Sequence, residues 1–268
     1  MSKNLDISQI YEFFKLVYYN QEASREEVRN FLNDCLQFVF AANDLDIADY
    51  NIIIHDAKPI SPKKQLTRLN VYESNIKETE IPPYEVCFMW QDEKKSNTFH
   101  VCFNRNETVF KNVNEYSYED LILFIYFAMH EFGHIIQYIK FPDIMEYYNY
   151  NREVAHTNVP TYANILDKKT KRIVLREFKK YIDAQAAGCK VERDANGQAY
   201  AYLSTILKEL INQEEDYEFK YFLHTALLFL NKVKKEDYSS YRIANKLSKD
   251  AISKLSSLGV DEEMYLID

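Results

Sequence analysis

Glycine and proline are scarce in this chain, with four glycines and six prolines among 268 residues. Tight turns often need glycine, because it adopts a left-handed backbone without strain. The scarcity therefore argues against a fold with many short turns. Aromatic residues are abundant instead, with 22 tyrosines and 17 phenylalanines. This composition favours a mostly helical protein with many amphipathic side chains at its surface.

Cysteine is also sparse, and its four positions show no C-x-x-C pairing. This argues against a cysteine-ligated zinc site and against a disulfide framework, and it fits a reducing compartment. The first residues, Met-Ser-Lys-Asn-Leu-Asp, contain no apolar signal core. No apolar run is expected to reach the length that spans a bilayer. We therefore expect a cytoplasmic protein with no membrane partner.

Positive charge is in deficit, because 33 lysines and arginines face 41 acidic residues, which gives a formal net charge of −8. The basic pairs Lys63-Lys64 and Lys179-Lys180 are too short to form a stripe. Affinity for nucleic acid depends mainly on basic side chains that neutralise phosphates. Nucleic acid is therefore not an expected partner.

The apolar pattern predicts two helices near the N-terminus. Residues 8–19 carry apolar groups at helical spacing, and Ser24 with Glu27 forms a capping box for a second helix. We expect these helices to form a hairpin domain over residues 1–45. A second domain, with additional C-terminal helices, is expected over residues 46–268.

Four runs rich in β-branched and aromatic residues follow the hairpin, and such residues favour strands. They predict a small mixed or antiparallel sheet. The expected fold class is α+β and mainly helical, with the sheet before a buried helix. The predicted strands cover residues 50–55, 65–72, 84–90 and 98–104.

The rest of the chain is expected to be helical except for one long irregular connection over residues 142–170. The first helix, capped by Ser117, is apolar all round and therefore buried. Thr170 is the expected N-cap of the next, and Gly259 the stop of the last. The predicted helices cover residues 117–140, 170–187, 191–210, 215–233 and 239–258.

The buried helix contains the sequence His130-Glu131-Phe132-Gly133-His134. At helical spacing His130 and His134 project from one face, as binding to a shared metal ion requires. Glu131 lies about 100° around the helix, where its carboxylate reaches a water on the metal rather than the metal itself. Burying these polar groups among apolar residues is costly without a metal or other partners. The pattern predicts a zinc hydrolase.

Zinc held by two histidines needs a third protein ligand and leaves the fourth position to water. We expect this ligand to be Glu192, because it lies on a predicted helix. Asn196, four residues later, shares that helix face and can support a ligand histidine. The other candidates are Glu146, Glu153, Asp194 and, for a three-histidine site, His156.

The sequence His130-Glu131-Phe132-Gly133-His134, followed by Glu192-x-x-Ala195-Asn196-x-x-Ala199, resembles the signature of the gluzincin metallopeptidases. The helix-first layout, the small sheet and the Ala-Asn pair are most similar to the ImmA/IrrE-type bacterial and phage peptidases. Anthrax lethal-factor-like peptidases also carry HEFGH. The resemblance implies a zincin-like fold in which His130, His134 and Glu192 bind Zn²⁺.

The same resemblance implies a zinc-dependent endopeptidase that cleaves a protein substrate. Glu131 would take the proton of a zinc-activated water during attack on a peptide carbonyl. An extended substrate would pair with the strand 98–104 as a sheet edge. A further group often stabilises the oxyanion. The candidates for it are His156, Tyr200, Tyr202 and His224, of which His224 is more typical of a buried core histidine.

Two alternatives belong to other functional classes. A non-catalytic zincin-fold module would bind a protein partner without cleaving it, but the presence of Glu131 beside both histidines favours the enzyme. In a metal-free helical interaction protein, the HEFGH sequence would be accidental. His55 and His100 are expected to be structural. The sequence predicts neither the cleaved sequence nor the oligomeric state.

Overall fold

The structure is a computed structural model that describes residues 7–19, 23–59, 80–81, 87–92, 94–104 and 118–265. The described chain is mainly helical and contains a small mixed sheet, so the predicted α+β class is confirmed. It divides into two compact units. Unit 1 comprises residues 1–136 and 198–231, and unit 2 comprises residues 137–197 and 232–268. The domain boundary after residue 45 stays a prediction.

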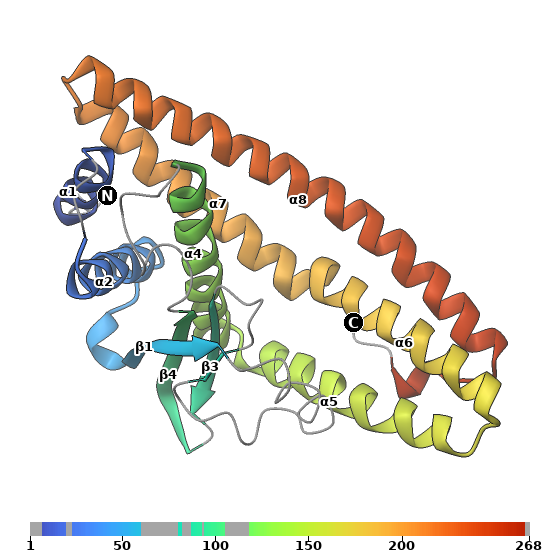
Figure 1. Cartoon of the computed structure of the whole chain (residues 1–268). Coiled ribbons are helices and arrows are strands. Elements are labelled where there is room, and N and C mark those ends of the chain that lie inside the picture. Colours follow the sequence, from blue (N-terminus) through green and yellow to red (C-terminus); the bar gives the residue numbers. More distant parts are fainter. Residues whose placement is uncertain are drawn as a thin grey trace. The chain divides into compact units, whose positions relative to one another are not determined.

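The predicted N-terminal helices are α1 (Ser8–Tyr18) and α2 (Arg25–Ala42), both in unit 1 (Figure 1). They pack together, with the rings of Phe13 and Phe31 stacked at a centroid distance of 4.0 Å. The capping box is confirmed, because the Glu27 amide donates to the Ser24 hydroxyl and the Ser24 amide donates to the Glu27 carboxylate.

The sheet of unit 1 has the strand order β2-β1-β4-β3, with β1 (Asn51–Pro59), β2 (Glu80–Ile81), β3 (Cys87–Asp92) and β4 (Lys95–Asn104). Strand β4 runs parallel to β1 and antiparallel to β3. The strand predicted over residues 65–72 lies outside the described residues. A short 3-10 turn, Ile47–Asp49, precedes β1.

The position of β4 corrects one expectation. The strand predicted over residues 98–104 was expected to be a sheet edge, but β4 is paired on both sides, with β1 and β3. Its backbone groups are therefore not available to a peptide. In the described sheet, the terminal strand next to β4 is β3. Edge position depends on pairing between distant segments, which a period-2 pattern does not encode.

One face of the sheet packs against α4 (Tyr118–Lys140). Phe99, Val101 and Phe103 of β4 are buried, and the rings of Phe103 and Phe124 lie 5.5 Å apart. The buried helix expected here is confirmed, although its predicted cap, Ser117, lies outside the described residues.

Helix α4 also corrects the expectation about membrane spans. By length and composition it is able to cross a bilayer, contrary to the prediction that no run is long enough. However, 67% of its most apolar 18-residue window is buried inside the protein. A buried core helix meets the same criteria, so they are weak evidence for a membrane span.

The connection expected over residues 142–170 is instead mostly helix α5 (Pro142–Asn164). Pro142 occupies the first turn, where its missing N–H costs nothing. Pro160 lies inside the helix, which continues because Val159 and Ala163 are buried in the core of unit 2. The two prolines made this segment appear irregular in the sequence. It is nevertheless a helix, because its apolar face is buried in the core.

Three further helices follow in the part of the chain that the structure describes: α6 (Lys168–Gly188), α7 (Lys190–Gln213) and α8 (Tyr217–Ser257). The N-cap of α6 is Asp167 rather than Thr170, because the Asp167 carboxylate accepts the amides of Lys169 and Thr170. The two helices predicted over residues 215–258 are a single helix, since its sequence contains neither glycine nor proline. A short 3-10 turn, Glu262–Met264, lies near the end of the described chain.

Candidate metal centre

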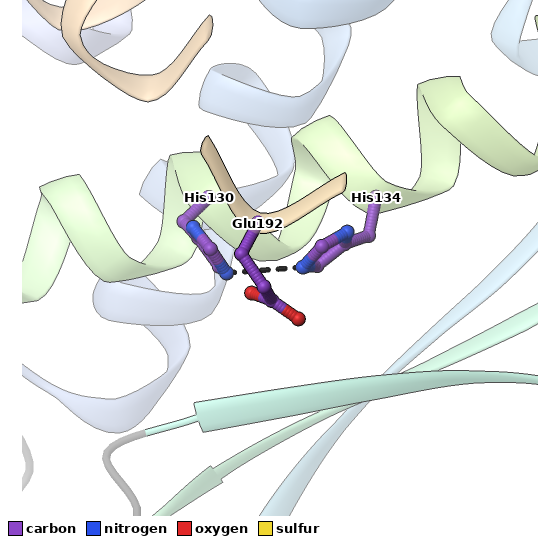
Figure 2. A group of neighbouring side chains, drawn as sticks. All are labelled: His130, His134 and Glu192. Atoms are coloured by element: carbon purple, nitrogen blue, oxygen red, sulfur yellow. Dashed lines mark hydrogen bonds between the residues drawn. The ribbon is translucent and has the colours of Figure 1, made fainter. Parts of the chain in front are cut away.

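The two histidines of HEFGH lie one helical turn apart on α4, and their Nε2 atoms approach to 3.0 Å (Figure 2). His134 is buried and His130 is half-buried. Their helix is held in place by completely buried apolar neighbours, Met129, Phe132 and Ile135. Local helical spacing therefore positions both nitrogens on one face, as the sequence predicted.

Glu192 lies in the first turn of α7. Its carboxylate and the two imidazoles each present one ligand atom, and these three atoms lie within 4.8 Å of one another. Figure 2 shows the Glu192 carboxylate beside the facing ring nitrogens of His130 and His134. Residues far apart in the sequence thus form a group with the ligand types that zinc prefers.

Two hydrogen bonds fix the start of α7. The buried side chain of Gln137, three residues after His134, donates from Nε2 to the carbonyl oxygen of Val191 at 2.9 Å. The Tyr148 hydroxyl of α5 donates to Glu192 Oε1 at 3.2 Å. The first bond restrains the backbone directly before Glu192, and the second restrains its carboxylate.

The Tyr148 hydroxyl lies in a buried environment that keeps it protonated. Burial, followed by the nearby negative charge of Glu192, raises the pKa of Tyr148 well above its usual value. The Cys189 thiol is a second neighbour of this hydroxyl, and burial also raises the pKa of Cys189. At neutral pH the tyrosine is therefore a hydrogen-bond donor.

Tyr148 is the member of this site that sequence reasoning missed. It belongs to a tyrosine-rich stretch of the sequence. The prolines at 142 and 160 argued against a helix there, although the stretch lies on α5. The available signal was apolar spacing, because Met145, Tyr148, Ala155 and Val159 are the buried positions of one helix face.

No protein-family model, curated protein or solved structure matches this chain. A functional assignment therefore depends on the chain's own residues. The most informative of them are His130, Glu131, His134 and Glu192.

The rival ligands do not join this group. Among the described residues, the candidate metal-binding group contains His130, His134 and Glu192 and not His156. The His156 ring instead packs against Phe178 at a centroid distance of 5.8 Å, and burial, with a contribution from Arg152, lowers its pKa. The three acidic rivals, Glu146, Glu153 and Asp194, are exposed.

Glu131 and Asn196 lie on the two helices that carry the candidate ligands. Glu131 directly follows His130 and is half-buried, and it is not one of the grouped ligands. Asn196 lies one turn after Glu192 on α7 and is also half-buried. The roles of general base and of support for a ligand stay predictions.

The candidates for oxyanion stabilisation have other contacts. The Tyr200 hydroxyl donates to Asn231 Oδ1 at 2.8 Å. The Tyr202 hydroxyl accepts from Asn43 at 2.6 Å, and burial raises the pKa of Tyr202. His224 is exposed, so the expectation of a core histidine is wrong. Its position on α8 is on the outer face, together with exposed residues such as Tyr221 and Leu228.

His55 and His100 form a separate pair within the sheet. His55 Nε2 and His100 Nδ1 lie 2.8 Å apart, and the Trp90 ring stacks on both imidazoles. His100 Nε2 lies 3.7 Å from Asp92. These contacts link β1, β3 and β4 across one face, as expected of structural residues.

Proposed function

We propose that this chain is a zinc-dependent metallo-endopeptidase of zincin-like fold that acts on a protein substrate in the cytoplasm. The observation that carries the proposal is the group of His130, His134 and Glu192, whose ligand atoms lie within 4.8 Å of one another. Glu131, directly after the first histidine, supplies the remaining group that peptide hydrolysis needs.

The donor set fits zinc with an open position. Two imidazoles and one carboxylate are the protein ligands of many catalytic zinc sites. Zinc–nitrogen bonds of about 2.0–2.1 Å at tetrahedral angles would separate the two nitrogens by roughly 3.3 Å. The observed separation of 3.0 Å needs only a small adjustment. Zinc bound here would supply a Lewis acid that polarises a carbonyl and lowers the pKa of water.

The chain's own residues supply the proton transfers and the substrate contacts. Glu131 accepts a proton from the attacking water and delivers it to the leaving amine. An extended substrate pairs through main-chain groups with β3, the terminal strand of the described sheet, in place of β4. This arrangement recognises a backbone and therefore suits a segment of a protein.

Metal analysis of the purified chain is the first test. After incubation with zinc and removal of the excess, we expect one zinc ion per chain in the wild type. We expect none in a variant with His130→Ala and His134→Ala. A wild-type chain that fails to bind zinc would end the proposal.

Cleavage of a peptide library is the second test. We expect Glu131→Gln to keep its zinc and to lose roughly 10²–10⁴-fold in rate, the usual contribution of a general base. Equal cleavage by both forms would exclude Glu131 as the base. A wild-type chain that binds zinc and cleaves nothing would favour the non-catalytic binding module.

A further inference from the structure

We propose that Tyr148 is a positioning residue of the metal centre: its hydroxyl holds one oxygen of Glu192 so that the other is presented to the metal. The inference rests on the proposed role of Glu192 as a metal ligand. It adds a group from α5, a helix that carries none of the three grouped residues His130, His134 and Glu192.

Tyr148 and Glu192, which make this contact, both belong to unit 2. The Tyr148 hydroxyl donates to Glu192 Oε1 at 3.2 Å. The tyrosine side chain is 7% exposed and belongs to the same buried cluster as Met145 and Val191. Val191 directly precedes Glu192, so the ring and the backbone that carries the ligand are packed into one core.

A fixed ring gives the hydroxyl a fixed position. The Arg152 guanidinium lies 6.0 Å from the centroid of the Tyr148 ring, so a cation contact adds to the apolar packing. A glutamate side chain otherwise has several rotatable bonds, and ordering it costs conformational entropy. A donor already held by the core reduces the cost of ordering Glu192 when the metal binds.

The expected size of the effect follows from other metal sites. Groups that hydrogen-bond to metal ligands orient them, and losing such a group typically costs about 10–100-fold in metal affinity. Tyr148→Phe removes the hydroxyl but keeps the ring. A purely structural role of the ring would be retained in this variant, whereas the bond to Glu192 would be lost.

The experiment compares the affinity of the full chain for Zn²⁺ by competition with a chromogenic chelator. We expect Tyr148→Phe to bind zinc about 10–100-fold more weakly than the wild type. Tyr147→Phe is the matched control, because this neighbouring tyrosine is 56% exposed, and it should change affinity less than 2-fold, roughly within measurement error.

A comparison in a Glu192→Ala background distinguishes a positioning role of Tyr148 from a purely structural one, because only the positioning role depends on Glu192. In a Glu192→Ala background, Tyr148→Phe should cause no further loss of zinc affinity, because the bond is already absent. An additional 10-fold loss, roughly the full single-variant effect, would show that Tyr148 acts otherwise and would overturn the inference.

The outcomes separate this inference from the proposed function. Wild-type affinity in Tyr148→Phe would overturn the positioning role while leaving the metal centre intact. Absence of zinc binding by the wild type would overturn both. Urea unfolding of the metal-free variants checks that each is folded, so that a loss of affinity is not a loss of structure.

Discussion

At the scale of single residues, the short distance between His130 and His134 restricts what can lie between their ring nitrogens. Their Nε2 atoms lie 3.0 Å apart, and His134 is 8% exposed. Two imidazole nitrogens at this distance share either one proton or one metal ion. The Glu192 carboxylate is the third member of this group.

The identity of the third ligand gives a prediction about zinc affinity. We expect Glu192→Ala to weaken zinc binding by more than the roughly 100-fold typical of losing a supporting group, because a ligand itself is removed. His156→Ala should leave affinity unchanged, since His156 packs against Phe178 outside the ligand group. Equilibrium dialysis with zinc measures both. The reverse ranking of the two variants would establish a three-histidine site.

The sequence predicted these residues unequally, for physical reasons. His130 and His134 were predictable because their relation is local to one helix. Glu192 was selected among rivals by its helix and by Asn196, and the structure places it with the histidines. Apolar spacing could have predicted that Tyr148 is buried, but not its contact with Glu192, which depends on tertiary packing between α5 and α7.

At the scale of elements, two glycines have opposite expected effects on stability. Gly259, beyond the end of α8, has φ +79°, and a Cβ there would lie 3.3 Å from the Tyr162 hydroxyl. Gly259→Ala should therefore lower the free energy of unfolding by about 1–2 kcal/mol. At Gly197, inside α7, such a Cβ meets no atom of the described residues within 4 Å apart from its chain neighbours and its own helix backbone. Gly197→Ala should therefore raise the free energy of unfolding by about 0.5–1 kcal/mol.

Urea unfolding monitored by circular dichroism measures both changes. Because the two substitutions are chemically identical, each is the control for the other. Destabilisation by both, or stabilisation by both, would contradict the prediction.

A hydrogen bond between α1 and the residue that follows α7 gives a prediction about how the stability of the fold depends on pH. Glu214 is buried and accepts from the Tyr11 hydroxyl at 2.7 Å. Burial raises the pKa of Glu214, but hydrogen bonds from Tyr11 and from the Asp216 amide outweigh it, and the pKa is lowered overall. A lowered pKa in the folded state stabilises the fold above the unfolded-state pKa, and this stability is lost as pH falls through the folded-state pKa.

Tyr11→Phe should therefore lower the free energy of unfolding at pH 7 by about 1–2 kcal/mol. The difference from the wild type should shrink at acid pH, where Glu214 is protonated in both. Tyr19→Phe is the control, because Tyr19 is 53% exposed. Urea unfolding at several pH values tests this, and a difference independent of pH would show that the charge of Glu214 is not involved.

The errors about elements share one cause. Prolines 142 and 160, and the residues between 233 and 239, were placed outside the predicted helices, yet α5 and α8 include them. A proline in the first turn costs little, and buried residues such as Val159 stabilise a helix across a local defect. The strand order was not predictable, because pairing of β1 with β4 joins residues 47 positions apart.

At the scale of the whole molecule, a metal bound by residues distant in sequence should stabilise the folded chain. Zinc at about 100 times its dissociation constant would add about 2.7 kcal/mol if it binds only the folded state. For a chain of this length, the melting temperature should rise by about 5–10 °C. Calorimetry with and without zinc measures the shift.

The control for this prediction is the variant with His130→Ala and His134→Ala, whose melting temperature should not respond to zinc. An equal response of this variant would show that zinc acts elsewhere on the chain. Addition of a chelator to the zinc-loaded wild type should reverse the shift.

The hydrogen bond from Gln137 to Val191 limits how α4 can change during evolution. An insertion of one residue between His134 and Gln137 would rotate the histidines by about 100° relative to that bond. The imidazoles would then no longer lie on the side of α4 from which the Gln137 side chain contacts Val191 at the start of α7. We therefore expect insertions and deletions not to be tolerated within this single turn.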